Sequence, residues 1–282
     1  MSHNQREIFD AVAFESSKIV ATRYSTSFSS GIRLLHQKLR NPVYAIYGFV
    51  RYADEIVDTL HEHNRGELLA RFRLDTETAL REGISMNPIL QSFQITCARY
   101  NISYDLIDTF LKSMEMDLNE VKYGRSSFDQ YILGSAEVVG LMCLRVFTDG
   151  DDTNYEKLKP YAMSLGAGFQ KINFLRDLKA DVEGLGRMYF PDLNFQRLTD
   201  EDKKRIELEI ESDFTHAYHG IKMLPKEARL GVFVAFVYYK RLFLKIRALP
   251  SHRIMEERIR IPNNQKLALV MKCYIKSNLN ML

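Results

Sequence analysis

Apolar residues recur at steps of three and four along most of this chain, which is the spacing of one face of an α-helix. Clear examples are residues 65–80 and residues 103–121. No stretch alternates apolar and polar residues over the length of a strand, and no Asn-Gly hairpin signal occurs. The pattern predicts an all-α protein, and we expect roughly nine or ten helices in one bundle, a single domain over residues 1–282.

Polar residues followed by a proline or by acidic residues mark where several helices are expected to begin. Asn41 and Asn87 each precede a proline, which is favoured at the first helical position. Ser127, with Gln130 three residues later, matches a capping box, and Thr199 precedes an acidic first turn. We therefore expect helices to begin at these four positions.

Two short acidic segments, each ending an apolar helical run, carry the strongest chemical signal. Residues 44–58 place Asp54 four residues before Asp58, and residues 168–181 place Asp177 four residues before Asp181. A four-residue step brings both carboxylates of a pair onto one helix face, roughly 6 Å apart. Like charges at this spacing repel, and a cation between them relieves the repulsion. Since oxygen ligands hold Mg²⁺, the repetition predicts two facing carboxylate banks with divalent ions between them.

Each acidic pair continues a polar stripe along its own helix, which argues against the alternative of an ordinary solvated face. The stripes are Tyr47, Arg51, Asp54 and Asp58 on the first helix, and Gln170, Asn173, Asp177 and Asp181 on the second. Arg51, Arg176 and Arg187 can reach the same cavity, although simple charge balance with a neighbouring aspartate is an equal alternative for each. Arginine together with metal suits a highly charged anion such as a diphosphate, and an apolar cavity would shelter the carbocation left when that group departs.

The overall composition excludes several classes of function. The 39 Lys and Arg residues nearly balance 36 Asp and Glu, a net charge of +3, and no RNA-binding motif occurs, so we expect no nucleic-acid partner. Gly-X-Gly-X-X-Gly and Walker-type loops are absent, which argues against a Rossmann or P-loop nucleotide site. A ferritin-like di-iron site is excluded because no histidine follows a glutamate at the required spacing.

Cysteine usage and apolar runs bear on the compartment. The three cysteines are far apart in apolar runs, as expected for free thiols in a reducing compartment. The first ten residues lack an apolar signal core, and the longest apolar run, residues 230–239, is half of the roughly 20 residues that span a bilayer. We expect a cytoplasmic monomer without a spanning helix, with at most loose peripheral membrane association for release of a lipid product.

At this point the motifs resemble those of a known family, the squalene and phytoene synthases, which are head-to-head prenyltransferases. Residues 51–58 (RYADEIVD) resemble the first aspartate signature of that family, and residues 170–181 with 186–191 (GRMYFP) resemble the second. Similarity continues in the same order over nearly the whole chain, in residues 24–32, 113–118, 131–140 and, more loosely, 257–267. The resemblance implies an all-α isoprenoid-synthase fold with a central cavity.

The resemblance also implies roles for individual residues of this sequence. Mg²⁺, with Mn²⁺ as a substitute, would be held by Asp54 and Asp58 on one wall and by Asn173, Asp177 and Asp181 on the other. The residues expected to touch diphosphate or the reacting carbons are Ser25, Ser27, Phe28, Tyr47, Arg51, Gln170, Asn173, Arg176, Arg187 and Tyr239. Of these, Arg51 and Tyr239 are expected to join the four aspartates in catalysis.

The reaction implied by the resemblance joins two prenyl diphosphates through a cyclopropyl diphosphate intermediate and releases two diphosphates. We expect a phytoene synthase of the bacterial type, which condenses two geranylgeranyl diphosphates in carotenoid synthesis and needs no NADPH. The near alternative is a dehydrosqualene or squalene synthase that uses farnesyl diphosphate. An alternative of another class is a non-catalytic helical relative, which would be expected to have lost the aspartate pairs that are intact here.

Three positions depart from the pattern of the resembled family. Glu55 replaces the usual second aspartate of the first motif, and the segment that begins Tyr131-Ile132-Leu133 lacks its second tyrosine. Glu137 stands where the family usually has glycine. A carboxylate in an apolar tunnel would be costly unless paired or protonated, so Glu137 either points away from the tunnel or changes its shape.

Overall fold

The computed structural model describes residues 2–119, 123–191, 198–256 and 258–278, and they form helices without a β-strand. These described residues contain thirteen α-helices and one π-helical turn, more than the nine or ten expected, because short breaks divide several runs. The helices are α1 (Ser2–Tyr24), α2 (Thr26–Arg33), α3 (Gln37–Asp58), α4 (Arg65–Glu82), α5 (Pro88–Tyr100), α6 (Tyr104–Met116), α7 (Arg125–Ile132), η1 (Leu133–Glu137), α8 (Val138–Phe147), α9 (Asp152–Leu185), α10 (Asp200–Met223), α11 (Lys226–Arg247), α12 (Ser251–Glu256) and α13 (Asn263–Asn278). The all-α prediction is confirmed.

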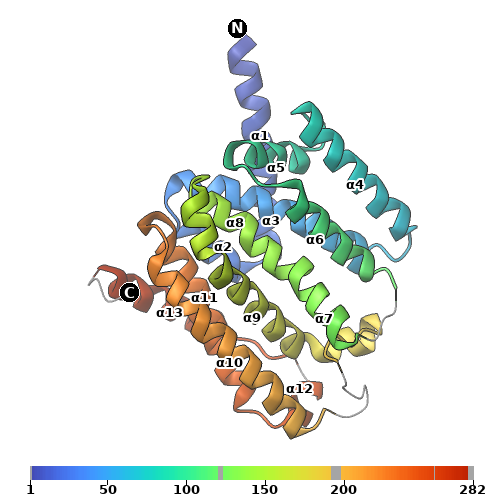
Figure 1. Ribbon diagram of the computed structural model, residues 1–282, viewed down its shortest axis with the longest axis vertical. Coiled ribbons are helices and arrows are strands. Elements are labelled where there is room, and N and C mark those ends of the chain that lie inside the picture. Colours follow the sequence, from blue (N-terminus) through green and yellow to red (C-terminus); the bar gives the residue numbers. More distant parts are fainter. Residues whose placement is uncertain (1, 120–122, 192–197, 257, 279–282) are drawn as a thin grey trace.

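Two helices organise the bundle, and they are the two that carry the acidic pairs. The α3 helix packs against α1, α4, α5 and α8, and the 34-residue α9 packs against α8, α10 and α11. In Figure 1 the blue and green helices around α3 form the upper part of the molecule, and the olive and orange helices around α9 form the lower part. The η1 turn and α8 contact both halves, so the two acidic helices lie on either side of the centre of the bundle.

The helix-start predictions are half right. Asn87 and Thr199 are N-caps as predicted, and Thr199 forms a capping box with Asp202. The prediction at Asn41 is wrong, because α3 already begins at Gln37, and its early turn buries the side chain of Leu39. Burial of that side chain compensates for the helix hydrogen bond that the proline at position 42 cannot make.

The prediction that Ser127 is an N-cap is also wrong. The α7 helix begins at Arg125 with Gly124 as its N-cap, and the Ser127 hydroxyl donates to the Gly124 carbonyl over 3.0 Å. Serine hydroxyls make such local bonds to backbone carbonyls inside helices as well as at their ends. The sequence signal was therefore displaced by three residues.

One continuous helical stretch bears on the expectation that no helix spans a membrane. Residues 125–147, which comprise α7, η1 and α8, are long and apolar enough to cross a bilayer, with a mean hydropathy of 1.3. Of its most apolar part, 44% is buried inside the protein, and the stretch packs against α6 and α9. Core helices of soluble proteins meet the same criterion, so this stretch is weak evidence for a membrane span.

Candidate active site

A cavity of about 1060 Å³ lies between α2, α3, the η1–α8 segment, α9 and α11. Both acidic pairs and most of the other predicted site residues line it, namely Ser25, Ser27, Phe28, Tyr47, Arg51, Asp54, Asp58, Gln170, Asn173, Arg176, Asp177, Asp181 and Tyr239. Arg187 is the predicted residue that does not line it, although Arg187 bonds to Asp58. The sequence therefore predicts a set of side chains that the fold brings together, and their chemical roles stay predictions.

The two acidic stripes border the same cavity, and burial together with their mutual repulsion raises the pKa of carboxyl groups on both. Burial raises the pKa of Asp54 to about 8, and the negative charge of Asp58 adds to the rise. Burial also raises the pKa of Asp181 on α9 to about 7, and there the charges of Asp177 and of Asp58 add to the rise. Because Asp58 lies on α3 and still acts on Asp181, the carboxylates of the two helices point into one shared region.

These carboxylates offer oxygen ligands from two walls. Within the described residues, no three Asp, Glu, His or Cys side chains lie close enough to hold one metal ion together. Mg²⁺ does not need such a group, because it commonly takes one or two carboxylates and completes its shell with water and substrate phosphates. Mutually repelling carboxylates around a cavity fit a ligand set of that kind.

Arginines neutralise part of the acidic region. Arg51 pairs with Glu55 and lies 3.9 Å from Asp54, so the unusual glutamate of the first motif has an arginine partner. On the opposite wall, Asp177 pairs with Arg176 and also with Arg258. The Nε atom of Arg258 lies 2.6 Å from Oδ1 of Asp177. Sequence reasoning missed Arg258, and the only signal for it was the loose similarity of residues 257–267.

Arg187 lies outside the cavity lining and connects the two halves of the site through buried hydrogen bonds. Its side chain is only 4% exposed and donates to Asp58 Oδ1 over 2.7 Å, to the Asp117 carbonyl over 2.6 Å and to the Val57 carbonyl over 3.3 Å. Asp117 itself is buried and accepts from the hydroxyls of Tyr131 and Tyr189. Asp117 was not among the predicted site residues, although the segment that contains it, residues 113–118, carried part of the resemblance.

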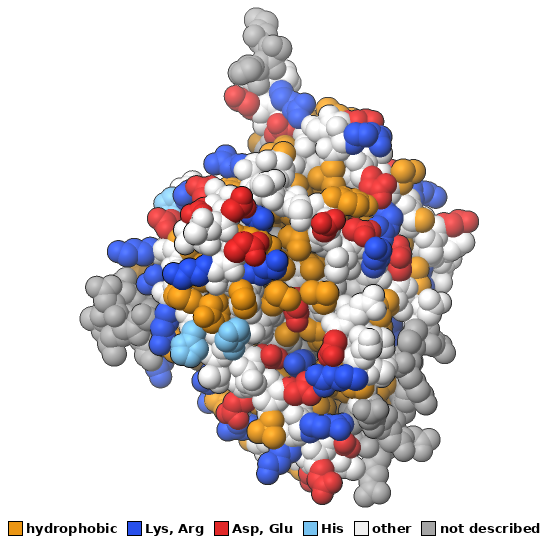
Figure 2. Space-filling model, viewed as in Figure 1, with side chains coloured by type: hydrophobic (Ala, Val, Ile, Leu, Met, Phe, Trp, Pro, Cys, Tyr) orange, Lys and Arg blue, Asp and Glu red, His pale blue; other side chains and the backbone are white. Residues whose placement is uncertain are grey.

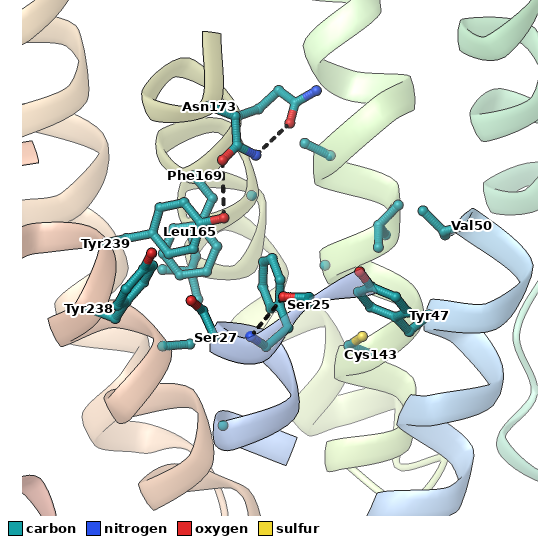
Figure 3. A pocket seen from close by; sticks show the side chains of 18 of the residues that line it. Ser25, Ser27, Tyr47, Val50, Cys143, Leu165, Phe169, Asn173, Tyr238 and Tyr239 are labelled. Atoms are coloured by element: carbon teal, nitrogen blue, oxygen red, sulfur yellow. Dashed lines mark hydrogen bonds between the residues drawn. The ribbon is translucent and has the colours of Figure 1, made fainter. Parts of the chain in front are cut away.

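A chain of hydrogen bonds runs from η1 along α9 to α11. Ser135 Oγ accepts from the Gln170 amide over 3.2 Å, Gln170 accepts from the Asn173 amide over 3.3 Å, and Asn173 accepts from the Tyr239 hydroxyl over 3.1 Å. Figure 3 shows the last two bonds, with Asn173 above the stacked rings of Phe169 and Tyr239. Burial raises the pKa of Tyr239 to about 12, so its hydroxyl stays protonated at neutral pH and can donate.

The α2 helix presents its first turn to the cavity. Ser25 is its N-cap and accepts from the backbone N–H of Phe28 over 3.1 Å, as Figure 3 shows. The ring of Phe28 packs against those of Tyr47 and Tyr239, with centroids 6.2 and 5.7 Å away. The positive end of the helix dipole at a helix start favours anions, so this turn is suited to face a phosphate.

Beyond the polar end, the cavity is largely apolar. Its lining there includes Val43, Ile46, Val139, Cys143, Leu144, Leu158, Leu165, Ile221, Leu224 and Val232. Tyr161 and Gly220 also contribute, and a Cβ on Gly220 would lie 2.2 Å from that of Tyr161. One acidic, arginine-bearing end joined to a long apolar space suits a ligand with a charged head and a hydrocarbon tail.

Glu137, which stands where the family usually has glycine, is not among the residues that line the cavity. Its charge acts instead on Lys171 and Asp213, on the side where α9 packs against α10. Burial raises the pKa of Glu137 to about 7, and repulsion from Asp213 adds to the rise. Of the two alternatives left by the sequence, the structure therefore favours a side chain that points away from the tunnel.

Comparison with known families bears directly on this arrangement. The family model for squalene/phytoene synthase matches residues 21–265, which include both acidic helices and every residue that lines the cavity except Lys266. The chain belongs to the squalene/phytoene synthase family. The expectation drawn from the aspartate motifs is confirmed at this level.

Individual relatives carry different names. The chain is 25% identical over 279 residues to phytoene synthase 1 of Arabidopsis thaliana, an alignment that covers 92% of this chain and 65% of the plant protein. It is 26% identical to 15-cis-phytoene synthase of Synechocystis, with 94% and 85% covered. A presqualene diphosphate synthase of Zymomonas mobilis is 32% identical, over 68% of this chain and 65% of that protein. The chain thus spans slightly less than two thirds of the plant relative.

Solved structures share the fold. A dehydrosqualene synthase in complex with a ligand superposes with a TM-score of 0.79 at 16% identity, covering 95% of this chain and 98% of that chain. The squalene synthase HpnC from Alicyclobacillus acidocaldarius gives 0.75 at 18% identity, with 89% and 97% covered. The predicted isoprenoid-synthase type of helical bundle is thereby confirmed as a fold.

Proposed function

We propose that this protein is a Mg²⁺-dependent prenyltransferase that joins two prenyl diphosphates head to head. The preferred substrate is geranylgeranyl diphosphate, and the product is phytoene, formed through a cyclopropyl diphosphate with release of two diphosphates and without NADPH. The observation that carries the proposal is the cavity with two facing carboxylate walls at one end and an apolar lining in the remainder.

The donor set fits the metal. In this proposal Asp54 and Asp58 bind from α3, and Asn173, Asp177 and Asp181 bind from α9. Bound there with diphosphate, Mg²⁺ (or Mn²⁺) would supply positive charge that stabilises the leaving group. Hard oxygen donors and buried, mutually repelling carboxylates support this assignment over a softer metal, because no histidine is found among the described residues that line the cavity.

The side chains around the metal ligands have separate tasks. Arg51 and Arg176 line the cavity beside the carboxylates and can donate to phosphate oxygens, as can the first turn of α2. The Asn173 amide fixes the Tyr239 hydroxyl, which faces the same space. The rings of Phe28, Phe169 and Tyr239 can stabilise an allylic carbocation through their π faces and keep water away from it.

A second candidate is favoured by a specific finding. The 32% identical relative is a presqualene diphosphate synthase, so coupling of two farnesyl diphosphates is the near alternative. That chemistry ends at a cyclopropyl diphosphate, or continues to dehydrosqualene or, with NADPH, to squalene. These outcomes differ in carbon number and in the number of diphosphates released per coupling.

One experiment separates these candidates. Purified protein is incubated with Mg²⁺ and either farnesyl or geranylgeranyl diphosphate, with and without NADPH, and the products and free diphosphate are quantified. The proposal expects a C40 hydrocarbon and two diphosphates per coupling from the C20 substrate alone. A C30 product contradicts the choice of substrate, and one diphosphate per coupling contradicts the second half of the reaction.

A non-catalytic role is tested in the same assay. It expects no product from either substrate, and no difference between the wild-type protein and Asp54→Asn or Asp177→Asn. We further propose a monomer located in the cytoplasm. Gel filtration of the purified protein tests the first point, and cell fractionation tests the second.

A further inference from the structure

The end of the cavity that lies farthest from the carboxylates is closed by a cluster of apolar side chains. Tyr161 is one of them, and it precedes Asp177 on the long helix α9. At roughly 1.5 Å per residue, the Cα atoms of these two residues are about 24 Å apart. The side chains of this apolar cluster that also line the cavity are called the far-end cluster, namely Leu144, Phe147, Leu158, Tyr161, Leu224 and Val232.

The packing of α8 against α9 shows why the cavity ends there. A Cβ on Gly166 of α9 would lie 2.7 Å from the carbonyl oxygen of Ala136. Farther along, a Cβ on Gly140 of α8 would lie 3.1 Å from the carbonyl oxygen of Ala162. The two helices therefore run antiparallel in close contact, and the end of α8 lies beside the first half of α9. Both supply side chains to the far-end cluster.

The Tyr161 side chain lies directly against a glycine of α10. A Cβ on Gly220 would lie 2.2 Å from the Cβ of Tyr161 and 2.7 Å from its Cγ, so no larger residue fits at position 220 without displacing the tyrosine. The helices α9 and α10 pack side by side, as Figure 1 shows. Glycine inside a helix is less favourable than alanine, and here its small size leaves the room that Tyr161 occupies.

On the side of α10, Tyr161 also contacts a residue of the outer surface. The rings of Tyr161 and His216 have centroids 4.5 Å apart, and His216 Nδ1 lies 2.8 Å from the hydroxyl of Ser164. Both His216 and His219 are exposed, and histidine side chains appear over α10 on the face shown in Figure 2. Tyr161 therefore lies between the apolar cavity and the outer surface of α10.

We propose that Tyr161 sets the longest hydrocarbon chain that the cavity accepts, because its ring fills the space beside Gly220 at the far end. That the chain belongs to a prenyl diphosphate rests on the proposed function. With the diphosphate held near Asp177, the tail extends along α9 until it meets the ring. Each methylene buried before that point favours binding, whereas carbons beyond it overlap packed side chains. Affinity should therefore rise with chain length to a maximum and then fall.

A length series of ligands tests the proposal without turnover. Dissociation constants of non-reactive prenyl thiodiphosphates from C10 to C30 are measured by calorimetry with the full-length protein and Mg²⁺. For the wild type we expect the tightest binding at C20. Tyr161→Ala should move the maximum to the analogue that is one prenyl unit longer. The affinity for that analogue relative to the wild-type optimum should rise at least about tenfold, since burial of about two further methylenes suffices for this gain. Tyr161→Phe keeps the ring and should keep the wild-type maximum.

A matched control removes the same ring elsewhere. Tyr218 on α10 packs against Phe236 and is not among the residues that line the cavity, so Tyr218→Ala should leave the maximum where it is. If thermal unfolding shows that Tyr161→Ala does not fold, Tyr161→Val carries the same expectation. An unmoved maximum in the folded small variant, wild-type affinity that is independent of chain length, or an equal shift in Tyr218→Ala would overturn the proposal.

The two proposals can fail separately, because binding and coupling are measured apart. If Tyr161→Ala moves the maximum but the wild type forms no coupled product from any substrate, the proposed reaction fails and the role of Tyr161 stands. A wild-type maximum at C15 that Tyr161→Ala moves to C20 contradicts only the choice of substrate. If coupling occurs and the maximum does not move, the role of Tyr161 alone fails.

Discussion

The most demanding prediction concerns Arg187, whose guanidinium joins the two acidic helices from inside the protein. In Arg187→Met, Asp117 loses its nearby positive charge and its carbonyl loses the bond from Arg187, whereas the Val57 carbonyl keeps its bond from Arg65. Removing one partner of a buried ion pair costs about 3–5 kcal/mol, because the remaining charge stays buried. For a protein of this size such a loss lowers Tm by on the order of 10 °C.

The assay is a double-mutant cycle followed by denaturant unfolding. Asp117→Asn removes the negative charge and keeps groups that can bond to Tyr131 and Tyr189. In Arg187→Met/Asp117→Asn no buried carboxylate is left unpaired at this position, so the double variant should be more stable than the sum of the single losses by at least about 1 kcal/mol. A loss below about 1 kcal/mol for Arg187→Met, or strict additivity of the two single losses, would show that Arg187 and Asp117 do not form a stabilising buried pair.

The pH dependence of the stability of Arg187→Met tests the same ion pair independently of the double-mutant cycle. Burial raises the pKa of Asp117 to about 6 even though Arg187 opposes the rise. Without Arg187 that pKa rises further, so at pH 5 the carboxyl is protonated and leaves no charge uncompensated. The destabilisation by Arg187→Met should thus be smaller at pH 5 than at pH 8.

Two further predictions concern positions outside the acidic end. Because the pKa of Glu137 is raised from 4.5 to about 7, the native state binds more protons than the unfolded state between those values, and its stability falls as pH rises through that window. Glu137→Gln should flatten that fall in denaturant titrations, whereas the exposed Glu156→Gln should leave the slope unchanged. Gly220→Ala should cost about 1–3 kcal/mol of unfolding free energy, since its Cβ would overlap Tyr161. The control Gly184→Ala, with nothing within 4 Å, should be neutral or stabilising, and the reverse order would contradict the packing argument.

The local part of the site could be predicted from sequence because helix geometry alone determines it. A four-residue step places Asp54 with Asp58 and Asp177 with Asp181 on one face whatever the rest of the chain does. That the two faces oppose each other is a tertiary property, and the repeated motif only suggested it. The structure adds that Asp58 interacts electrostatically with Asp181 across the cavity.

The parts that sequence reasoning missed depend on contacts between distant segments. Arg258 reaches Asp177 from 81 positions along the chain, and no local pattern marks it as a site residue. The α3 helix begins before the expected Asn41 cap because burial of Leu39 outweighs a local signal. The orientation of Glu137 follows from packing of η1 between α6 and α9, which periodicity cannot supply.

A crystal structure with Mn²⁺ and a non-reactive prenyl thiodiphosphate would test whether the two acidic helices hold metal and diphosphate between them. Mn²⁺ can replace Mg²⁺ and is located by its anomalous scattering. We predict anomalous peaks within about 2.2 Å of carboxylate oxygens from both α3 and α9, with the thiodiphosphate between the helices and the tail in the apolar part of the cavity. Peaks on neither helix, or an analogue bound elsewhere, would contradict it.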